Sequence, residues 1–344
     1  MPNCVEILKE KFSRSLGIPW QGILSASTIE EVLLSSTISD AESSQTKKRR
    51  NRFFNPIVTL WAFLYQVLDE DKSCSNAVSK IVAWLAASNM KTPSSNTGGY
   101  TKAKQRLSEN FLKNLFQKTG DNLEEKSQSQ DLWCGRHVKM MDGSSVLMPD
   151  TIANQSCYPQ HSNQSPGCGF PIAKLVVMFS LVTGAAMGVL IEAFNTSEIV
   201  MARQMYYLLS PQDVALADRA FGTYVDLVLV KARLADAVFR CHHSRKTDFK
   251  RGKRLSENDY LVTWYKPKTR PRHMSAIEFN CLPNSLIVRQ VRFQVTESGF
   301  RTKEIIVVTT LLDEKMYTKQ KIAQLYRWRW QVEIDLRIST FWWW

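Results

Sequence analysis

Residues 172–194 have the sequence IAKLVVMFSLVTGAAMGVLIEAF, and this stretch decides the fold class. Two apolar runs, residues 172–182 and 186–194, flank a short turn. Strands that are apolar on both faces belong at the centre of a sheet that is covered on two sides. A membrane span would need about 18 uninterrupted apolar residues, and Thr183 and Gly184 interrupt this one. The stretch therefore predicts a central β-hairpin, and we expect no membrane partner.

The segments on either side of the hairpin extend the pattern. Before it, residues 137–143 predict a short strand that runs into a turn. After it, we expect a helix at 198–209, a brief buried strand at 213–218 and a second helix at 223–232. Strands and helices in this order predict an α/β fold with a mixed sheet.

A basic, β-rich segment follows at residues 239–309. Strand-like alternation appears at 238–241, 260–264, 286–295 and 304–309. Residues 240–272 contain eleven Lys and Arg against three Asp and Glu, an excess of eight positive charges (11 − 3). We interpret the segment as an insertion that offers a nucleic-acid surface and divides a core of residues 132–238 and 310–340.

The first third of the chain has a different pattern of apolar and polar residues. Residues 1–50 combine short apolar pieces with a polar run and end in the basic cluster that begins at Lys47. Residues 51–131 repeat apolar positions at helical spacing, which predicts a helical domain. This domain could bind DNA ends, and an all-helical dimerisation or packing module is equally compatible with the pattern.

Composition limits the class of partner and the compartment. Lys and Arg number 45 against 32 Asp and Glu, so the formal net charge is +13, and this favours a polyanion such as nucleic acid. The charged residues near the N-terminus, among them Glu6 and Lys9, do not suit a signal peptide. Seven cysteines at scattered spacings are most simply those of a reduced, cytoplasmic protein.

The stretch LYRWRWQVEIDLR at residues 325–337 carries a polar stripe. Tyr326, Arg329, Glu333 and Arg337 are spaced 3, 4 and 4 apart, which places them on one face of a helix. A carboxylate with an arginine one turn before and one turn after it suits a site that binds a metal and a phosphate together. An ordinary amphipathic surface helix would show the same spacing.

Three carboxylates stand out by their context. We expect Asp142 at a strand end before Gly143, Asp218 at the end of a second strand, and Glu333 on the last helix. Mg²⁺ binds few, hard oxygen ligands and leaves room for water and phosphate oxygens. Two such ions about 3.5–4 Å apart can clamp the attacking and leaving oxygens of a phosphoryl transfer. The set therefore fits two-metal phosphoryl chemistry.

At these residues the chain resembles a known family. The segments MDGS at 141–144, ADRAFGTY at 217–224 and the YxxRxxxE pattern at 326–333 resemble DDE transposases of the bacterial insertion-sequence-four type. The resemblance extends over residues 50–337 and implies a ribonuclease-H-like catalytic core. An insertion between the second and third acids is likewise a trait of that family.

The resemblance implies roles for individual residues. Asp142, Asp218 and Glu333 would bind two Mg²⁺ ions, for which Mn²⁺ can substitute, while Tyr326 and Arg329 would contact DNA phosphates. The implied activity is cut-and-paste transposition: water cleaves double-stranded DNA at terminal inverted repeats, and the freed 3′-hydroxyl attacks target DNA. A homodimer would act on paired ends, and the protein would lie with the nucleoid when bound to DNA.

Weaker signals in the sequence suggest roles for further residues. Relatives place an aromatic residue of the insertion against a flipped base, and Trp264 is the candidate here; core packing is the competing interpretation of that residue. Arg337 and Arg219 are candidate phosphate contacts, and Arg219 could instead form a salt bridge. The family has a lysine seven residues after the glutamate, where this chain has Thr340. We therefore expect a truncated or frame-shifted copy, and the alternative function is a catalytically impaired DNA-binding remnant.

Other residues are alternative candidates for metal binding. Two groups of Cys and His are candidate zinc ligands: Cys157 with His161 and Cys168, and Cys241 with His242 and His243. Zinc is not favoured at either group, because the paired spacing of structural zinc sites is missing. Four further carboxylates, expected to be solvated surface groups, are Asp150, Asp213, Asp226 and Asp335.

Overall fold

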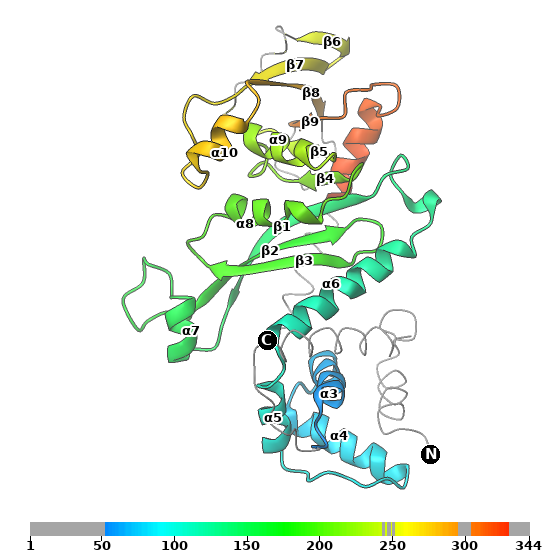
Figure 1. Cartoon of the computed structure of the whole chain (residues 1–344), viewed down its shortest axis with the longest axis vertical. Helices are drawn as coiled ribbons and strands as arrows, with labels where there is room; N and C mark the ends of the chain where they lie inside the picture. Colours follow the sequence, from blue (N-terminus) through cyan, green and yellow to red (C-terminus); the bar gives the residue numbers. More distant parts are fainter. Residues whose placement is uncertain (1–51, 243–244, 246–248, 250–251, 295–303, 330–344) are drawn as a thin grey trace. The chain divides into compact units, whose positions relative to one another are not determined.

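The computed structural model describes residues 52–242, 245, 249, 252–294 and 304–329 (Figure 1). The chain divides into two compact units, one of residues 1–123 with 339–344 and one of residues 124–338. In the described part of the chain, no helix is both long enough and apolar enough to cross a membrane.

The described part of the first unit is helical, as the sequence of this region predicts. Its helices are α3 (Pro56–Leu68), α4 (Cys74–Ala87), α5 (Gly98–Lys104) and α6 (Glu109–Glu125), the last of which ends in the second unit. Side-chain caps begin α3 and α4, because Asn55 accepts a hydrogen bond from the Val58 amide and Ser73 accepts one from the Asn76 amide. The apolar faces of these helices form a single core around Trp61.

The second unit contains one nine-stranded sheet with the strand order β3-β2-β1-β4-β5-β9-β8-β7-β6. Strand β2 is antiparallel to both of its neighbours, β1 and β3, whereas β4 runs parallel to β1 and β5 runs parallel to β4. Three antiparallel strands followed by two parallel ones, in the order 3-2-1-4-5, form the ribonuclease-H-like topology. The predicted mixed α/β fold is confirmed. The strands are β1 (Val138–Leu147), β2 (Ile172–Ser180), β3 (Ala186–Ala193), β4 (Val214–Ala217), β5 (Asp236–Arg240), β6 (Lys253–Ser256), β7 (Asp259–Tyr265), β8 (Ser285–Gln294) and β9 (Glu304–Thr309).

Helices cover both faces of this sheet. One face carries α8 and α9, whose residues Met201 and Val225 pack on Ala215 and Phe239 of the strands. The other face carries the helix that begins at residue 319 and is described as far as residue 329. The remaining helices of the unit are η2 (Ser129–Asp131), α7 (Ile152–Cys157), α8 (Glu198–Met205), η3 (Tyr206–Leu208), α9 (Tyr224–Ala232) and α10 (Ala276–Cys281).

The structure corrects the expected end of the first strand. Strand β1 does not turn at Gly143 but continues to Leu147. The reason is that β2 supplies a partner along the whole length, with Asp142 opposite Val177 and Gly143 opposite Val176. Only the parallel pairing of β1 with β4 stops at Met141. Asp142 is therefore not at the end of a strand, although it lies just beyond the last residue that pairs with β4.

The basic segment is β-rich, but its strands do not form a separate sheet. Strand β9 pairs with the edge of β5, and β8, β7 and β6 follow in order (Figure 1). Buried residues of these strands, such as Val291 and Val307, join the core beneath the last described helix. The segment therefore extends the central sheet and continues its hydrophobic core.

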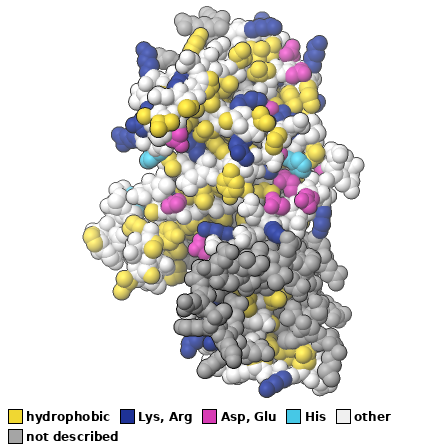
Figure 2. All heavy atoms as spheres, in the orientation of Figure 1, with side chains coloured by type: hydrophobic (Ala, Val, Ile, Leu, Met, Phe, Trp, Pro, Cys, Tyr) yellow, Lys and Arg dark blue, Asp and Glu magenta, His cyan; other side chains and the backbone are white. Residues whose placement is uncertain are grey.

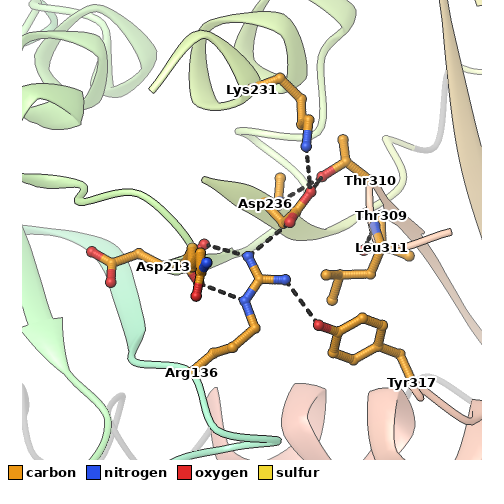
Figure 3. Close-up of polar contacts among 10 residues, drawn as sticks. Arg136, Asp213, Lys231, Asp236, Thr309, Thr310, Leu311 and Tyr317 are labelled. Carbon is orange, nitrogen blue, oxygen red and sulfur yellow. Dashed lines mark hydrogen bonds and ion pairs between the residues drawn. The ribbon is translucent and has the colours of Figure 1, made fainter. Parts of the chain in front are cut away.

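A polar network fastens the amino ends of β1 and β5 to the segment after β9 (Figure 3). Arg136 donates to the Asp236 carboxylate at 2.7 Å and to the Tyr317 hydroxyl at 3.1 Å. Thr310 and Lys231 also donate to Asp236, at 2.7 and 2.9 Å. The network fixes where the chain leaves the sheet before the last described helix begins.

Candidate active site

Three charged residues lie in a row across neighbouring strands. The parallel registers pair Met141 of β1 with Ala217 of β4, and Ala217 with Phe239 of β5. The next residues in sequence are Asp142, which still belongs to β1, Asp218, which directly follows β4, and Arg240, which ends β5. Paired strands are separated by about 4.8 Å, so this register sets Asp218 between Asp142 and Arg240 at the carboxyl end of β4.

The row faces the helix that carries Tyr326 and Arg329. Side chains alternate along a strand, so Asp142 shares a face with Met140, and Arg240 shares one with Val238. Met140 and Val238 belong to the core that also contains Leu325 and Tyr326 of the last described helix. Residues far apart in the sequence, from β1, β4, β5 and this helix, therefore meet at one place.

Tyr326 is the described residue of the helix that reaches the row. Its side chain is 1% exposed, and that of Arg329 is 7% exposed. Burial raises the pKa of the Tyr326 hydroxyl; the positive charges of Arg329 and Arg240 act against that rise, and the charge of Asp218 adds to it. The guanidinium of Arg329 also lies 5.6 Å from the centre of the Tyr326 ring. The hydroxyl is thus within electrostatic reach of both Asp218 and Arg240.

The loop after β4 holds Asp218 in place. The Asp218 carboxylate accepts a hydrogen bond from the Ala220 amide at 2.7 Å, which closes a tight turn. Four residues after Asp218, Gly222 packs so closely on β5 that a Cβ atom there would lie less than 3.0 Å from the Arg240 carbonyl oxygen. Only glycine lets the loop approach Arg240 in this way.

Strand β1 is also crowded at the site. The Asp142 carboxylate accepts a hydrogen bond from the Gly143 amide at 2.9 Å. A Cβ atom on Gly143 would lie 2.8 Å from the Glu198 carboxyl carbon, on the side where α8 packs. Gly143 therefore lets the first turn of α8 lie against β1 behind Asp142.

The two acids suit a divalent cation. They offer hard oxygen donors from adjacent strands, both partly exposed, as Mg²⁺ requires. Within the described residues, no group of three His, Cys, Asp or Glu side chains gathers as a metal site. The predicted third acid, Glu333, lies outside the described residues, as do Arg337 and Thr340.

Comparison with known proteins identifies the family. Residues 133–342, more than half of the chain, match the family described as the transposase DDE domain. The chain belongs to this family. Among the curated proteins, none matches it significantly. A solved structure of piggyBac transposase in a synaptic complex with hairpin DNA superposes with a TM-score of 0.40 and 9% identity, over 93% of this chain and 67% of that one.

Two residues of this DDE-domain chain that the sequence suggests as DNA contacts, Arg219 and Trp264, do not belong to the row of acids. Arg219 is exposed beside Asp218. Trp264 lies in the core on the opposite face of the sheet, 5% exposed, with the Arg245 guanidinium 3.7 Å from its ring centre. Its role in base flipping stays a prediction, and that role would require the indole to become accessible.

Two of the competing carboxylates are not the solvated groups that we expected. Asp213 is 3% exposed and pairs with Lys139 at 2.9 Å, and Asp226 is fully buried and pairs with Arg203 at 2.8 Å. The Asp213 carboxylate also accepts a hydrogen bond from the Ser210 amide, and the Asp226 carboxylate accepts one from the Tyr206 hydroxyl, so both acids brace neighbouring elements. Asp150 is exposed, as expected, and Asp335 lies outside the described residues.

Sequence reasoning missed Arg240 as a member of the site. The residue is an ordinary basic position at the end of an apolar run, and only the strand register brings it beside Asp218. A signal did exist, since residue 240 lies within the segment 238–241, which the sequence predicts as a strand. This signal would have identified Arg240 only if the predicted strand had been paired with the predicted strand at 213–218.

Proposed function

We propose that this chain is a DNA transposase of the insertion-sequence-four type that cleaves DNA at the ends of its element and joins the 3′-hydroxyl to target DNA. The observation that carries the proposal is the strand register that sets Asp142 of β1 beside Asp218, the residue after β4, under a helix that bears Tyr326 and Arg329. Membership of the DDE-domain family makes phosphoryl transfer the natural chemistry for such a pair.

The two acids, together with Glu333, would hold two Mg²⁺ or Mn²⁺ ions. These ions would activate the attacking oxygen and neutralise charge on the phosphate. Arg240 and Arg329 would bind a non-bridging phosphate oxygen and hold the scissile group over the acids. Tyr326 would orient the same phosphate as a hydrogen-bond donor, since the raised pKa of its hydroxyl keeps it protonated. Arg219 and Arg337 would contact neighbouring phosphates.

The partners would be double-stranded DNA with terminal inverted repeats and the target DNA, bound by two copies of the chain. Residues 51–131 would engage the DNA ends, while the basic strands of residues 239–309 would follow the backbone. Figure 2 shows Lys and Arg side chains, in dark blue, scattered over the part of the second unit that carries β6 to β9. The protein would act in the bacterial cytoplasm, on the nucleoid.

A second candidate function is a DNA-binding remnant that recognises ends without completing transposition. Thr340 favours it, because the family has a lysine there and a threonine cannot bind a phosphate as an ammonium group does. The remnant would still bind DNA, and it would fail to cut it.

A strand-nicking assay separates the two. The purified chain is incubated with supercoiled DNA that contains the element ends, with Mg²⁺, Mn²⁺ or EDTA. A transposase nicks at the ends with either metal, and both Asp142→Asn and Asp218→Asn abolish the product. Asp150→Asn is the matched control, because Asp150 is exposed and its carboxylate accepts a hydrogen bond from the Gln155 side chain. DNA binding without nicking in the unmodified chain supports the remnant, and nicking that survives both site substitutions contradicts the assigned acids.

A further inference from the structure

Four polar side chains of the helical unit meet at one point. They come from α3, α4 and α5 (Figure 1) and are Gln66, Cys74, Tyr100 and Lys104. The Gln66 side-chain oxygen lies at the centre, where it accepts hydrogen bonds from the Tyr100 hydroxyl at 2.8 Å and from the Lys104 ammonium at 3.1 Å. Its side-chain nitrogen donates to the Lys72 carbonyl oxygen at 2.8 Å, which fixes the orientation of the amide. The cluster contains no residue of the candidate active site, which belongs to the other unit.

Within this cluster, a thiol and an amine are in contact. The Lys104 nitrogen lies 3.2 Å from the Cys74 sulfur, to which it donates a hydrogen bond. Contacts with Gln66 and with the face of the Tyr100 ring, whose centre is 4.8 Å away, hold the amine in this position. Reacting atoms about 3–3.5 Å apart are close enough to form a bond without a larger rearrangement. Among the cysteines that the structure describes, Cys74 alone accepts a hydrogen bond from a lysine.

The position of Cys74 favours oxidation of its sulfur. Cys74 is the first residue of α4, a helix of 14 residues, so the positive end of the helix dipole lies beside it. The Lys104 ammonium adds a positive charge at 3.2 Å. Both stabilise the negative charge that a sulfur carries when it attacks an oxidant. The Cys74 side chain is half-buried, which leaves it accessible to a molecule as small as a peroxide.

We propose that Cys74 and Lys104 form a reversible covalent cross-link when a peroxide oxidises the sulfur. First, the sulfur attacks an oxygen of hydrogen peroxide, the O–O bond breaks, and a sulfenic acid and water are formed. Then the Lys104 amine, which has released a proton to solvent, attacks the sulfur; the S–O bond breaks, the oxygen leaves as water, and an S–N bond forms. In total, one thiol, one ammonium and one peroxide give one sulfenamide, two waters and one proton. The sulfur loses two electrons, and the peroxide gains them.

The cross-link ties the first turn of α4 to the last residue of α5. It closes residues 74–104 into a loop, and a closed loop restricts the unfolded chain as a disulfide does. Helix α5 has 7 residues and is too short to be stable without its surroundings, so the cross-link protects this helix most. A dithiol reductant restores the thiol and the amine, becomes a disulfide itself, and opens the loop again. The proposal concerns control of the helical unit by peroxide and does not depend on the proposed function.

Peptide mass spectrometry of the full chain tests the cross-link. The protein is treated with hydrogen peroxide, the remaining thiols are alkylated, and trypsin is added without reductant. Trypsin does not cleave after a bridged Lys104, so residues 73–80 should be found joined to residues 103–106. The mass of the joined pair should lie about 2 Da below the sum of the two peptides, because an S–N bond replaces one S–H and one N–H bond. A dithiol added before digestion should remove the pair.

Two variants and one internal control accompany this experiment. Lys104→Arg keeps a positive charge beside the sulfur but offers no amine that can lose its proton, and Cys74→Ser removes the sulfur. Neither variant should give the joined peptides, and Cys74 in Lys104→Arg should gain oxygen instead. Cys157, exposed at the last position of α7, reports the oxidation of a surface thiol in the same sample.

Two outcomes would overturn the proposal. One is the absence of joined peptides in a sample where Cys157 is oxidised, with Lys104 cleaved as usual. The other is a joined pair about 14 Da heavier than the sum of its peptides, because an oxygen would then remain between sulfur and nitrogen and the S–N step would be wrong.

Hydrogen exchange measures the effect on the helical unit. The amides of α5 should exchange at least about tenfold more slowly in the oxidised chain than in the reduced chain, because the closed loop makes local opening rarer. Cys74→Ser should show no such difference after the same peroxide treatment. Equal exchange of α5 in the cross-linked and the reduced chain would overturn the role of the bridge in holding this helix.

Discussion

Arg289 and Asp259 form an ion pair that is almost completely buried, with 0% and 2% of their side chains exposed. The Arg289 guanidinium donates to Asp259 at 2.8 Å and to the carbonyl oxygen of Tyr317 at 2.6 Å. Asp259 opens β7, Arg289 lies on β8, and Tyr317 precedes the helix that bears Tyr326. The pair therefore ties the basic strands to the segment that leads into the helix bearing Tyr326.

Asp259→Asn should lower the free energy of unfolding by about 3 kcal/mol, because it leaves the Arg289 charge buried without its counter-charge. Chemical denaturation measures the change. The double substitution Asp259→Leu with Arg289→Met is the control, and it should recover much of the loss since no charge then remains buried. Equal losses in the single and double variants would show that packing, and not the charge, is what matters.

Gly222→Ala should destabilise the protein by about 1–3 kcal/mol, the range for forced overpacking. The reason is the Arg240 carbonyl oxygen, which the new methyl group would approach closer than 3.0 Å. The same substitution at Gly167, where nothing lies within 4 Å of an added Cβ atom, tests only the backbone strain of its positive φ. Thermal unfolding compares the two, and a smaller loss at Gly222 than at Gly167 would contradict the close packing.

The stability of the second unit should fall in acid through Asp236. Burial alone would raise the pKa of Asp236, but hydrogen bonds from Thr310, Lys231 and Arg136 outweigh it, and the net pKa is lowered. A lowered pKa in the folded state gives stability that is present above the unfolded value, about 3.9, and is lost as the pH falls through the folded value. Denaturation at pH 6 and pH 3 should show a smaller pH dependence in Asp236→Asn. An unchanged dependence would exclude Asp236 as a contributor.

Arg240→Gln should reduce strand nicking by at least about tenfold, the effect of losing one charged hydrogen bond to the phosphate. The fold should persist, because the side chain is only partly buried. Arg240→Lys should restore part of the rate, since the charge returns without the planar fork. Single-turnover kinetics measure this, with Arg233→Gln as the control. Normal nicking by Arg240→Gln would remove Arg240 from the site.

The central hairpin and the alternation of strands and helices could be predicted from sequence, because apolar runs such as 172–182 are local signals. The continuation of β1 past Gly143 could not, since it depends on β2 as a partner. The burial of Asp213 and Asp226 also escaped prediction, because their cationic partners Lys139 and Arg203 are distant in sequence. Likewise, Arg240 joins the acids only through the pairing of β4 with β5.

Direct binding of Mn²⁺ tests the central claim that Asp142 and Asp218 together hold the divalent metal. Electron paramagnetic resonance counts the free ion in the presence of the unmodified chain, Asp142→Asn, Asp218→Asn and the control Asp150→Asn. We predict that the unmodified chain and the control bind Mn²⁺ alike, and that each site substitution removes most of the binding, because each takes one of two adjacent carboxylates from the same site. Binding of Mn²⁺ by both site variants at the level of the unmodified chain would contradict the account.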